Sequence, residues 1–469
     1  MPRLMLLAVL LFTTTSHATV YLTVQGSNVK KAKLALGKVH PLPNAVSADP
    51  QLVRNIAEQV KADLEFMNLF EFLPDSAMGD VDRPLDFYKI NYEQLTGRGV
   101  SFALKLGQKV ENGKLTLEAL LYDVPGQKKI FGTRYQYPAN QYPRLVHAMS
   151  EDILKELTGE KGLFFSRILM VCKDTATRRR PAGNKEVFLV DPDGRNLTQL
   201  TFDSTLSLSP AWSPDGKNIS YTQYGFVGRS SKKGTLLRRH NLQSGERKII
   251  SSKEGMNSGA AWSPKGGKIA VTLSFNGRPE VYLIGTNGGD PEPLTRNVQI
   301  KRIAGEGFQP SYASLLFDVE PSFSPDGNKL VFSSARSGHP MIYTVDLSNN
   351  VGTQLTFAGT YNSSPDWSPK GDKILFAAQR LAEGNFDIYL IDPDGNNLTR
   401  ITAGESLSAR RRANSENPTW APTGRHLAFA GNETGGYALY VMTLDGSVKR
   451  KLTPPGKECF DPAWGPAEN

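Results

Sequence analysis

The sequence predicts a two-domain chain, one part α+β and the other all-β. A small N-terminal α/β domain is followed by a six-bladed β-propeller, closed by a composite blade built from both ends of the repeat region. Two observations lead to this fold. A short phrase ending in Ser-Pro-Asp-Gly or a variant of it recurs from residue 210 onward, and an apolar strand with an Asp-Gly-type turn follows most copies. Recurrence at intervals of 40 to 60 residues is typical of propellers and repeat arrays.

The recurrent phrase places an aromatic residue before a tight turn. Its copies are 50, 61, 44, 53 and 44 residues apart, and all five tryptophans of the chain occupy the same position in it. The aromatic positions are Trp212, Trp262, Phe323, Trp367, Trp420 and Trp464. Proline fixes φ and glycine supplies a positive φ in such a turn, so each copy predicts two antiparallel strands, A and B. The second phrase adds strands C and D, and four strands make one blade.

The N-terminus predicts export. Arg3 precedes an apolar run over residues 4–12, and small residues lead to Ala18. This pattern is typical of a secretory signal peptide, here residues 1–18, cleaved after Ala18. The run is too short to span a bilayer, and no cysteine stands near the cleavage site. We therefore expect a soluble, exported protein with no membrane insertion and no lipid anchor, comprising an α/β domain over 19–160 and a propeller over 161–469.

The α/β domain is predicted from hydrophobic periodicity. Expected strands cover residues 20–23, 32–36, 70–73, 100–109, 115–122 and 129–137. Expected helices begin at Pro50, cover residues 87–95, and carry an apolar stripe from Leu145 to Leu157 that ends at Gly159. Asn112-Gly113 between two of the strands is a hairpin signal. The sequence has no glycine-rich phosphate loop here, so we expect no nucleotide role.

The repeat region begins and ends within a blade. Residues 167–172 match a strand B with no strand A before it, and residues 461–464 supply a strand A with nothing after it. We therefore expect the two ends to complete a sixth blade, which removes the open sheet edges. If each aromatic pairs with the position seven residues after it, Cys172 lies next to Cys459. An exported protein can keep such a disulfide, and the alternative is two buried thiols.

The irregular loops are predicted to gather on one face of the propeller. The A–B and C–D turns lie on one face, and the B–C and D–A loops lie on the other. Extra residues at 226–234, 296–318 and 403–416 all belong to the second class. Loops more often carry binding and repeated turns carry packing, so this loop face is the candidate binding face.

Residues shortly before each aromatic should ring the mouth of the central channel on the loop face. Three positions before it stand Ser209, Gly259, Glu320, Ser364, Asn417 and Asp461. Four and five positions before it stand, among others, Ser258, Ser363, Glu416, Asn257, Asp318 and Asn362. The alternative is that these residues are small because a channel mouth is crowded.

The repeats are not accompanied by a catalytic motif. The chain has no Gly-x-Ser-x-Gly elbow and no His-Glu-x-x-His, and its two cysteines lack zinc-site spacing. We expect no enzymatic activity, no cofactor and no metal, although Glu320, Glu416 and Asp461 leave a hard cation in the channel as an alternative. Aromatic residues for sugar stacking are not evident in the channel. The formal charge of +9 fits an acidic partner or a solvated basic surface, and export argues against nucleic acid.

The whole chain resembles the TolB family of the Tol-Pal system. The resemblance rests on the order of the domains, the joint Leu157-Thr-Gly-Glu-Lys-Gly162, the six repeats, and the closing Pro462-Ala-Trp464-Gly-Pro. It implies a periplasmic, non-enzymatic protein that supports outer-membrane integrity and constriction during division. It further implies binding of the peptidoglycan-associated lipoprotein Pal at the channel mouth, and of TolA by the extreme N-terminus of the mature protein. Other outer-membrane proteins are further candidate partners, and we expect a monomer.

The candidate contacts divide between the two partners. Those for Pal are Asn257, Ser258, Gly259, Asp318, Glu320, Ser363, Ser364, Glu416, Asn417 and Asp461, and the resemblance itself points to those before Trp262 and Phe323. Those for TolA are Thr19, Val20, Tyr21, Leu22, Thr23 and Val24. Two features depart from the family pattern: Phe323 replaces a tryptophan, and insertions at 296–318 and 403–416 change the mouth. The alternative function is a propeller attached to a peptidase or to a glycan-processing system.

Overall fold

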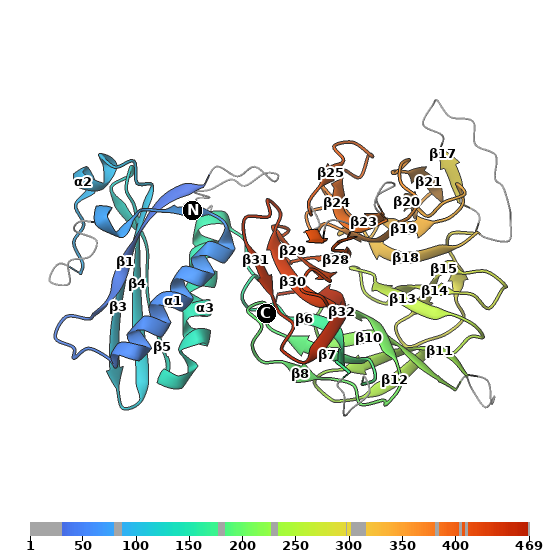
Figure 1. Cartoon of the computed structure of the whole chain (residues 1–469), viewed down its shortest axis with the longest axis horizontal. Coiled ribbons are helices and arrows are strands. Elements are labelled where there is room, and N and C mark those ends of the chain that lie inside the picture. The colour runs from blue at the N-terminus through green and yellow to red at the C-terminus, as the bar shows by residue number, and fades with distance from the viewer. Residues whose placement is uncertain are drawn as a thin grey trace, which may run out of the picture. The chain divides into compact units, whose positions relative to one another are not determined.

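The computed structural model in Figure 1 describes nine segments of the chain. They are residues 31–78, 87–176, 183–226, 233–296, 298–301, 316–379, 384–402, 406–408 and 411–467. The predicted signal peptide, the expected strand at 20–23 and the segment Thr19–Val24 lie outside the described residues. The contacts within the chain divide it into two compact units. The first comprises the residues up to Ala57 together with Glu71–Glu160, and the second comprises Glu58–Phe70 together with the residues from Lys161 onward. None of the described helices is both long and apolar enough to cross a membrane.

The N-terminal part is built on a five-stranded sheet of order β2-β1-β3-β4-β5. Its strands are β1 (Ala32–Pro41), β2 (Phe70–Phe72), β3 (Phe102–Glu111), β4 (Lys114–Asp123) and β5 (Lys128–Pro138). Its helices are α1 (Pro50–Met67), α2 (Tyr92–Thr96) and α3 (Tyr142–Thr158), with short 3-10 turns at Asp75–Ala77 and Ala139–Gln141. Strand β1 runs parallel to β3, and the β3–β4 and β4–β5 pairs are antiparallel.

Local sequence signals explain most of these boundaries. Helix α3 buries the predicted apolar stripe and ends at Gly159, whose φ of 74° glycine adopts without strain. Asn112 and Gly113, both at positive φ, form the two-residue turn between β3 and β4. The start of the helix expected over 87–95 is wrong, because α2 begins at Tyr92. The Asn91 side chain accepts a hydrogen bond from the Gln94 backbone N–H and so caps the helix at that point.

The propeller has five blades that are continuous in sequence. Blade 1 contains β9 (Ser207–Trp212), β10 (Asn218–Phe226), β11 (Lys233–Asn241) and β12 (Arg247–Ser251); blade 2 contains β13 (Asn257–Trp262), β14 (Lys268–Leu273), β15 (Glu280–Gly285) and β16 (Glu292–Pro293). Blade 3 contains β18 (Asp318–Phe323), β19 (Lys329–Ser334), β20 (Met341–Asp346) and β21 (Val351–Gln354), with β17 (Gln299–Lys301) as a fifth, outer strand.

The last two continuous blades follow the same order. Blade 4 contains β22 (Asn362–Trp367), β23 (Ile374–Gln379), β24 (Phe386–Ile391) and β25 (Thr399–Arg400); blade 5 contains β28 (Ser415–Trp420), β29 (His426–Gly431), β30 (Ala438–Thr443) and β31 (Lys449–Lys451). A small hairpin, β26 (Ser406–Ser408) and β27 (Arg411–Arg412), lies between them in the sequence. In all five blades the aromatic pairs with the residue seven positions later, as predicted.

The sixth blade is composite, as predicted from the truncated repeat. Its strand order is β32-β6-β7-β8, with β32 (Lys457–Trp464) from the C-terminus and β6 (Ile168–Asp174), β7 (Glu186–Val190) and β8 (Thr198–Gln199) from the start of the repeat region. Figure 1 shows β32, drawn in red, lying beside β6, drawn in green. Cys459 and Cys172 are direct partners across these strands and form a disulfide with a Cα–Cα distance of 4.2 Å. The ring is therefore closed by both hydrogen bonds and a covalent link.

Removing the disulfide should lower global stability, because it joins positions 287 residues apart. A cross-link over so long a loop restricts the unfolded chain, and its loss typically costs about 2–5 kcal/mol. Urea unfolding of the wild type with and without reductant measures this difference. The Cys172→Ser/Cys459→Ser variant is the control and should not respond to reductant. A wild-type midpoint unchanged by complete reduction would contradict the expected role.

Candidate functional site: the channel and the loop face

Each innermost strand carries an irregularity at the position three residues before the aromatic. The register of strands A and B shifts there in every blade. The six residues have φ between 45° and 60°: Ser209, Gly259, Glu320, Ser364, Asn417 and Asp461. A β-bulge of this kind bends the strand and re-aims the side chain, and only one of the six residues is glycine. The repeated irregularity therefore builds the channel wall.

All six of these residues line one central cavity of about 570 Å³, which we call the channel. The predicted ring at three positions before each aromatic is thus present. Three carboxyl groups face the channel, those of Glu320, Asp366 and Asp461. Among the described residues that line it, none is Lys, Arg or His. The described lining of the channel therefore carries acidic and no basic side chains, while the charge of Lys185, which is outside this lining, acts on Asp461.

The channel carboxylates also join neighbouring blades. The Ser364 backbone N–H of blade 4 donates to Glu320 Oε2 of blade 3 over 2.6 Å. Asp461 of the composite blade accepts hydrogen bonds from the Ser209 backbone N–H at 3.4 Å and from Asn417 Nδ2 at 3.2 Å. One set of carboxyl groups thus both shapes the ring and charges it.

Asp366 makes a third link of this kind, deeper in the channel. Its Oδ1 accepts from Ser322 Oγ of blade 3 at 3.0 Å, and its Oδ2 accepts from the Trp420 backbone N–H of blade 5 at 2.9 Å. One carboxylate of blade 4 therefore ties three blades together.

Burial raises the pKa of these carboxyl groups. It is the largest cause for Glu320, Asp366 and Asp461, because a carboxylate loses hydration when it is removed from water. The charge of Asp461 raises the pKa of Glu320 further, while the Ser364 N–H opposes the shift. Burial and the charge of Asp461 also raise the pKa of Glu416. A positively charged group entering the channel would relieve this repulsion.

A metal ion was the alternative occupant of the channel. In the part of the chain that the structure describes, no group of three or more His, Cys, Asp or Glu residues is placed to hold a metal ion. Glu416 instead accepts a hydrogen bond from the Tyr437 hydroxyl at 2.7 Å, and it is not among the residues that line the channel.

Several predicted mouth residues besides Glu416 do not line the channel. Asn257 is fully buried, and its side-chain amide donates to the backbone carbonyls of Lys253 at 2.7 Å and Thr235 at 2.8 Å. Asp318 is buried and accepts from Arg336 at 2.9 Å. Both residues hold loops in place, so the expectation that they contact a partner directly is corrected. Ser258 and Ser363 are partly exposed but also lie outside the channel lining.

The expectation that aromatic residues are lacking in the channel is also wrong. The six repeat aromatics line it toward the turn face. The indole N–H of Trp262 donates to Ser220 Oγ at 2.9 Å, that of Trp212 to the Ala463 carbonyl at 3.1 Å, and that of Trp420 to the Asp366 carbonyl at 3.1 Å. Each of these bonds reaches a neighbouring blade. These tryptophans therefore connect blades.

Sequence reasoning missed a group of exposed apolar side chains on the loop face. Five lie in D–A loops and one at the end of β10: Phe202, Leu206, Met256, Phe357, Tyr361 and Tyr224. Phe202 and Phe357 are the most exposed, at 68% and 57%. For these two a signal was available, because each directly follows a Leu-Thr pair that ends strand D. Exposed aromatic side chains in the loops of one face are typical of a protein-binding surface.

Comparison with known proteins decides the family. The model of the TolB β-propeller domain matches residues 154–468. The chain belongs to the TolB family. A TolB homologue of Chlorobium luteolum is 30% identical over 453 residues, covering 95% of this chain and 92% of the relative. The Tol-Pal system protein TolB of Alcanivorax borkumensis is 32% identical over 249 residues, covering 52% of this chain and 55% of the relative.

Structural comparison agrees with this family. The crystal structure of TolB from Acinetobacter baumannii matches with a TM-score of 0.70 at 24% identity, covering 93% of this chain and 97% of that one. At this identity the match shows the fold, a six-bladed propeller with a small N-terminal domain. The relatives in sequence indicate that this TolB-family chain is a component of the Tol-Pal system.

The raised pKa of Glu320 predicts a pH-dependent stability difference between the wild type and Glu320→Gln. Below the ordinary pKa of 4.5 the Glu320 carboxyl is protonated in both the folded and the unfolded states. Its ionisation then contributes nothing to the free energy of unfolding. As pH rises through the raised folded-state pKa, the wild type loses stability relative to the variant.

Urea unfolding between about pH 4 and about pH 8 should therefore show a growing advantage of Glu320→Gln. Glu292→Gln, at an exposed carboxylate, controls for the loss of one negative charge. A stability difference that stays constant over this pH range would contradict the prediction.

Proposed function

We propose that this protein is a non-enzymatic periplasmic scaffold of the Tol-Pal system that binds Pal through the channel mouth and the D–A loops. The observation that carries the proposal is the combination found on the loop face. The described lining of the channel has carboxyl groups and no basic side chain, and the D–A loops of the same propeller carry exposed aromatic side chains. A partner surface with a basic side chain between apolar residues would complement both features.

The size of the loop face supports a protein partner. A stable interface needs about 800 Å² from each protein, more than a channel mouth alone offers. The loops that carry Phe202, Met256 and Phe357 extend the surface over three blades. The opposite face consists mainly of short, repeated turns, which favours the loop face for binding.

We further propose that Thr19–Val24 forms the TolA-binding segment. Export with cleavage after Ala18 would make this segment the extreme N-terminus of the mature protein. The family resemblance supports this assignment. In the cell, the two interactions would support outer-membrane integrity and constriction during division.

Loss of the loop-face aromatics should weaken Pal binding. Titration calorimetry with the purified soluble domain of Pal measures the affinity of Phe202→Ala and Phe357→Ala. Truncation of a central aromatic typically costs about 2 kcal/mol, or roughly thirtyfold in affinity. Leu398→Ala is the matched control, since Leu398 is 55% exposed but follows a C–D turn. Equal affinities for all three variants and the wild type would place the Pal interface elsewhere.

Charge reversal in the channel should have a separate effect. Glu320→Arg removes the complement for a basic side chain and adds bulk at the mouth, so Pal affinity should fall at least tenfold. A thermal melt of the free protein verifies that the ring is intact. A folded Glu320→Arg variant that binds Pal with wild-type affinity would exclude the channel as the binding site.

Deletion of residues 19–24 from the mature protein should abolish TolA binding and leave Pal binding in place. The reason is that the deleted segment lies outside the propeller repeats. Surface plasmon resonance with immobilised TolA, and calorimetry with Pal, test the two interactions separately. Undiminished affinity for TolA would contradict the assignment of this segment.

A further inference from the structure

A second cavity lies between blades 2 and 3 on the loop face, and we call it the blade 2–3 pocket. It has a volume of about 650 Å³ and shares none of its lining residues with the channel. Its walls come from the B–C loops of both blades, from described residues at the two ends of the connection between β16 and β18, and from the loop after β21. Cavities of roughly 300–1,000 Å³ are of the size that holds small ligands or short peptide segments.

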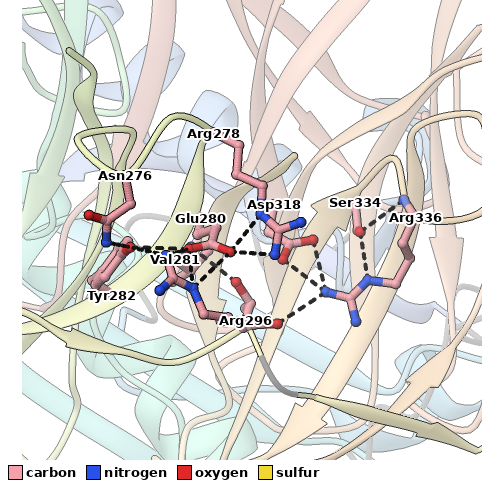
Figure 2. Close-up of polar contacts among 10 residues, drawn as sticks. Asn276, Arg278, Glu280, Val281, Tyr282, Arg296, Asp318, Ser334 and Arg336 are labelled. Atoms are coloured by element: carbon pink, nitrogen blue, oxygen red, sulfur yellow. Dashed lines mark hydrogen bonds and ion pairs between the residues drawn. The ribbon is translucent and has the colours of Figure 1, made fainter. Parts of the chain in front are cut away.

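One side of the pocket is a buried carboxylate held by two arginines. The Glu280 side chain is 2% exposed, and the side chains of Arg278 and Arg296 are 41% and 39% exposed. Arg278 Nε donates to Glu280 Oε1 at 2.8 Å, and Arg296 NH2 donates to Glu280 Oε2 at 2.7 Å. The Tyr282 hydroxyl is a third side chain that donates to Glu280, at 3.1 Å. Figure 2 shows the two guanidinium groups converging on Glu280.

A second ion pair beside this cluster involves one arginine. Arg336 NH2 donates to both carboxylate oxygens of Asp318 at 2.9 Å, and its Nε donates to Ser334 Oγ at 2.8 Å. Its guanidinium carbon lies 5.3 Å from the ring centroids of Phe332 and Tyr343. These contacts fix Arg336 in one position, at the right of Figure 2.

The pocket has a positive charge in excess. Three arginines and two carboxylates line it. Burial raises the pKa of Glu280, but hydrogen bonds from Arg296 and Arg278 outweigh it and hold the pKa below its ordinary value. Glu280 is therefore ionised at neutral pH and neutralises only one of its two partners. Within the described part of the chain, the NH1 groups of Arg278 and Arg296 make no hydrogen bond, so donors remain for a further anion.

An apolar wall faces the same space. It is made by Val298, Ile300, Phe317, Met341 and Phe357. Val298 and Ile300 belong to the connection and to β17, which pairs with β21. Gly352 in β21 permits this packing, because a Cβ there would meet Val298 and Ile300 side-chain atoms at 2.6 and 2.7 Å. A ligand in the pocket would thus meet both guanidinium groups and hydrocarbon side chains.

We propose that the blade 2–3 pocket binds the C-terminal carboxylate of a partner peptide whose last residue is apolar. In such a peptide the carboxylate and the apolar side chain are attached to the same Cα. They would therefore reach the guanidinium groups and the apolar side chains of one small pocket together. Guanidinium groups pair with carboxylates through parallel N–H bonds and are well suited to this recognition. The proposal goes beyond Pal and TolA and does not depend on either.

Fluorescence polarisation with labelled peptides tests the proposal on the intact mature protein. The probe is a hexapeptide ending in Phe-Leu with a free carboxylate. One comparison peptide is the same sequence amidated, and another is amidated with an internal Asp. We expect binding of the free-carboxylate peptide with a Kd below about 1 mM, and at least tenfold weaker binding of both amidated peptides. This comparison changes only the ligand, so it does not depend on how a variant folds.

Protein variants locate the site. Arg278→Gln should weaken binding of the free-carboxylate peptide at least tenfold, while Lys268→Gln, at an exposed ion pair of the same blade, should not. Equal binding of free and amidated peptides, or undetectable binding of all three, would overturn the proposal. So would binding that Arg278→Gln leaves unchanged. Binding of sodium laurate without binding of the peptide would also overturn it, in favour of a fatty acid.

Discussion

Strand β32 pairs with β6 from Lys457 to Trp464, and this pairing joins the two ends of the propeller. The channel depends on it, because one of the six innermost strands exists only when the C-terminus returns to the first repeat. Asp461 lies on that strand and accepts hydrogen bonds from blade 1 and blade 5. The Cys172–Cys459 disulfide secures the same pair of strands. An open ring would leave two unpaired sheet edges and no enclosed acidic channel.

The two faces of the closed ring differ in how uniform their connections are. On the turn face, short side-chain bonds such as Ser213 Oγ to Asp215 at 2.5 Å and Ser324 Oγ to Asp326 at 2.6 Å shape similar turns, which leaves little room for variation. On the loop face, the D–A loops vary in length, that from β16 to β18 being the longest, and several carry exposed apolar residues. The repeated bulge brings one residue of every blade into the channel close to that face. The turns at one end of the strands thus serve packing, and the loops at the other end are the candidate binding surface.

The sequence was sufficient for the architecture and for part of the site. The half-repeat at Trp464 predicted the composite blade, and counting from the aromatics predicted the ring and the neighbouring cysteines. Asn257 was misassigned because a regular strand would place it on the same side as Gly259, two residues later. The bulge at Gly259 breaks that alternation, as the register shift between Ser258 and Ala261 shows. The blade 2–3 pocket was not predictable, since it requires β17 to pair with β21 about fifty residues later.

We propose that the loop face, with the channel mouth, is the surface that recognises a partner. Hydrogen–deuterium exchange of the mature protein with and without purified Pal tests it most directly. We expect slower exchange in the D–A loops and at the start of the innermost strands, including residues 206–209, 256–259 and 318–320. We expect unchanged exchange in the Ser-Pro-Asp-Gly turns. Protection confined to those turns, with the D–A loops unaffected, would show that Pal binds the turn face instead.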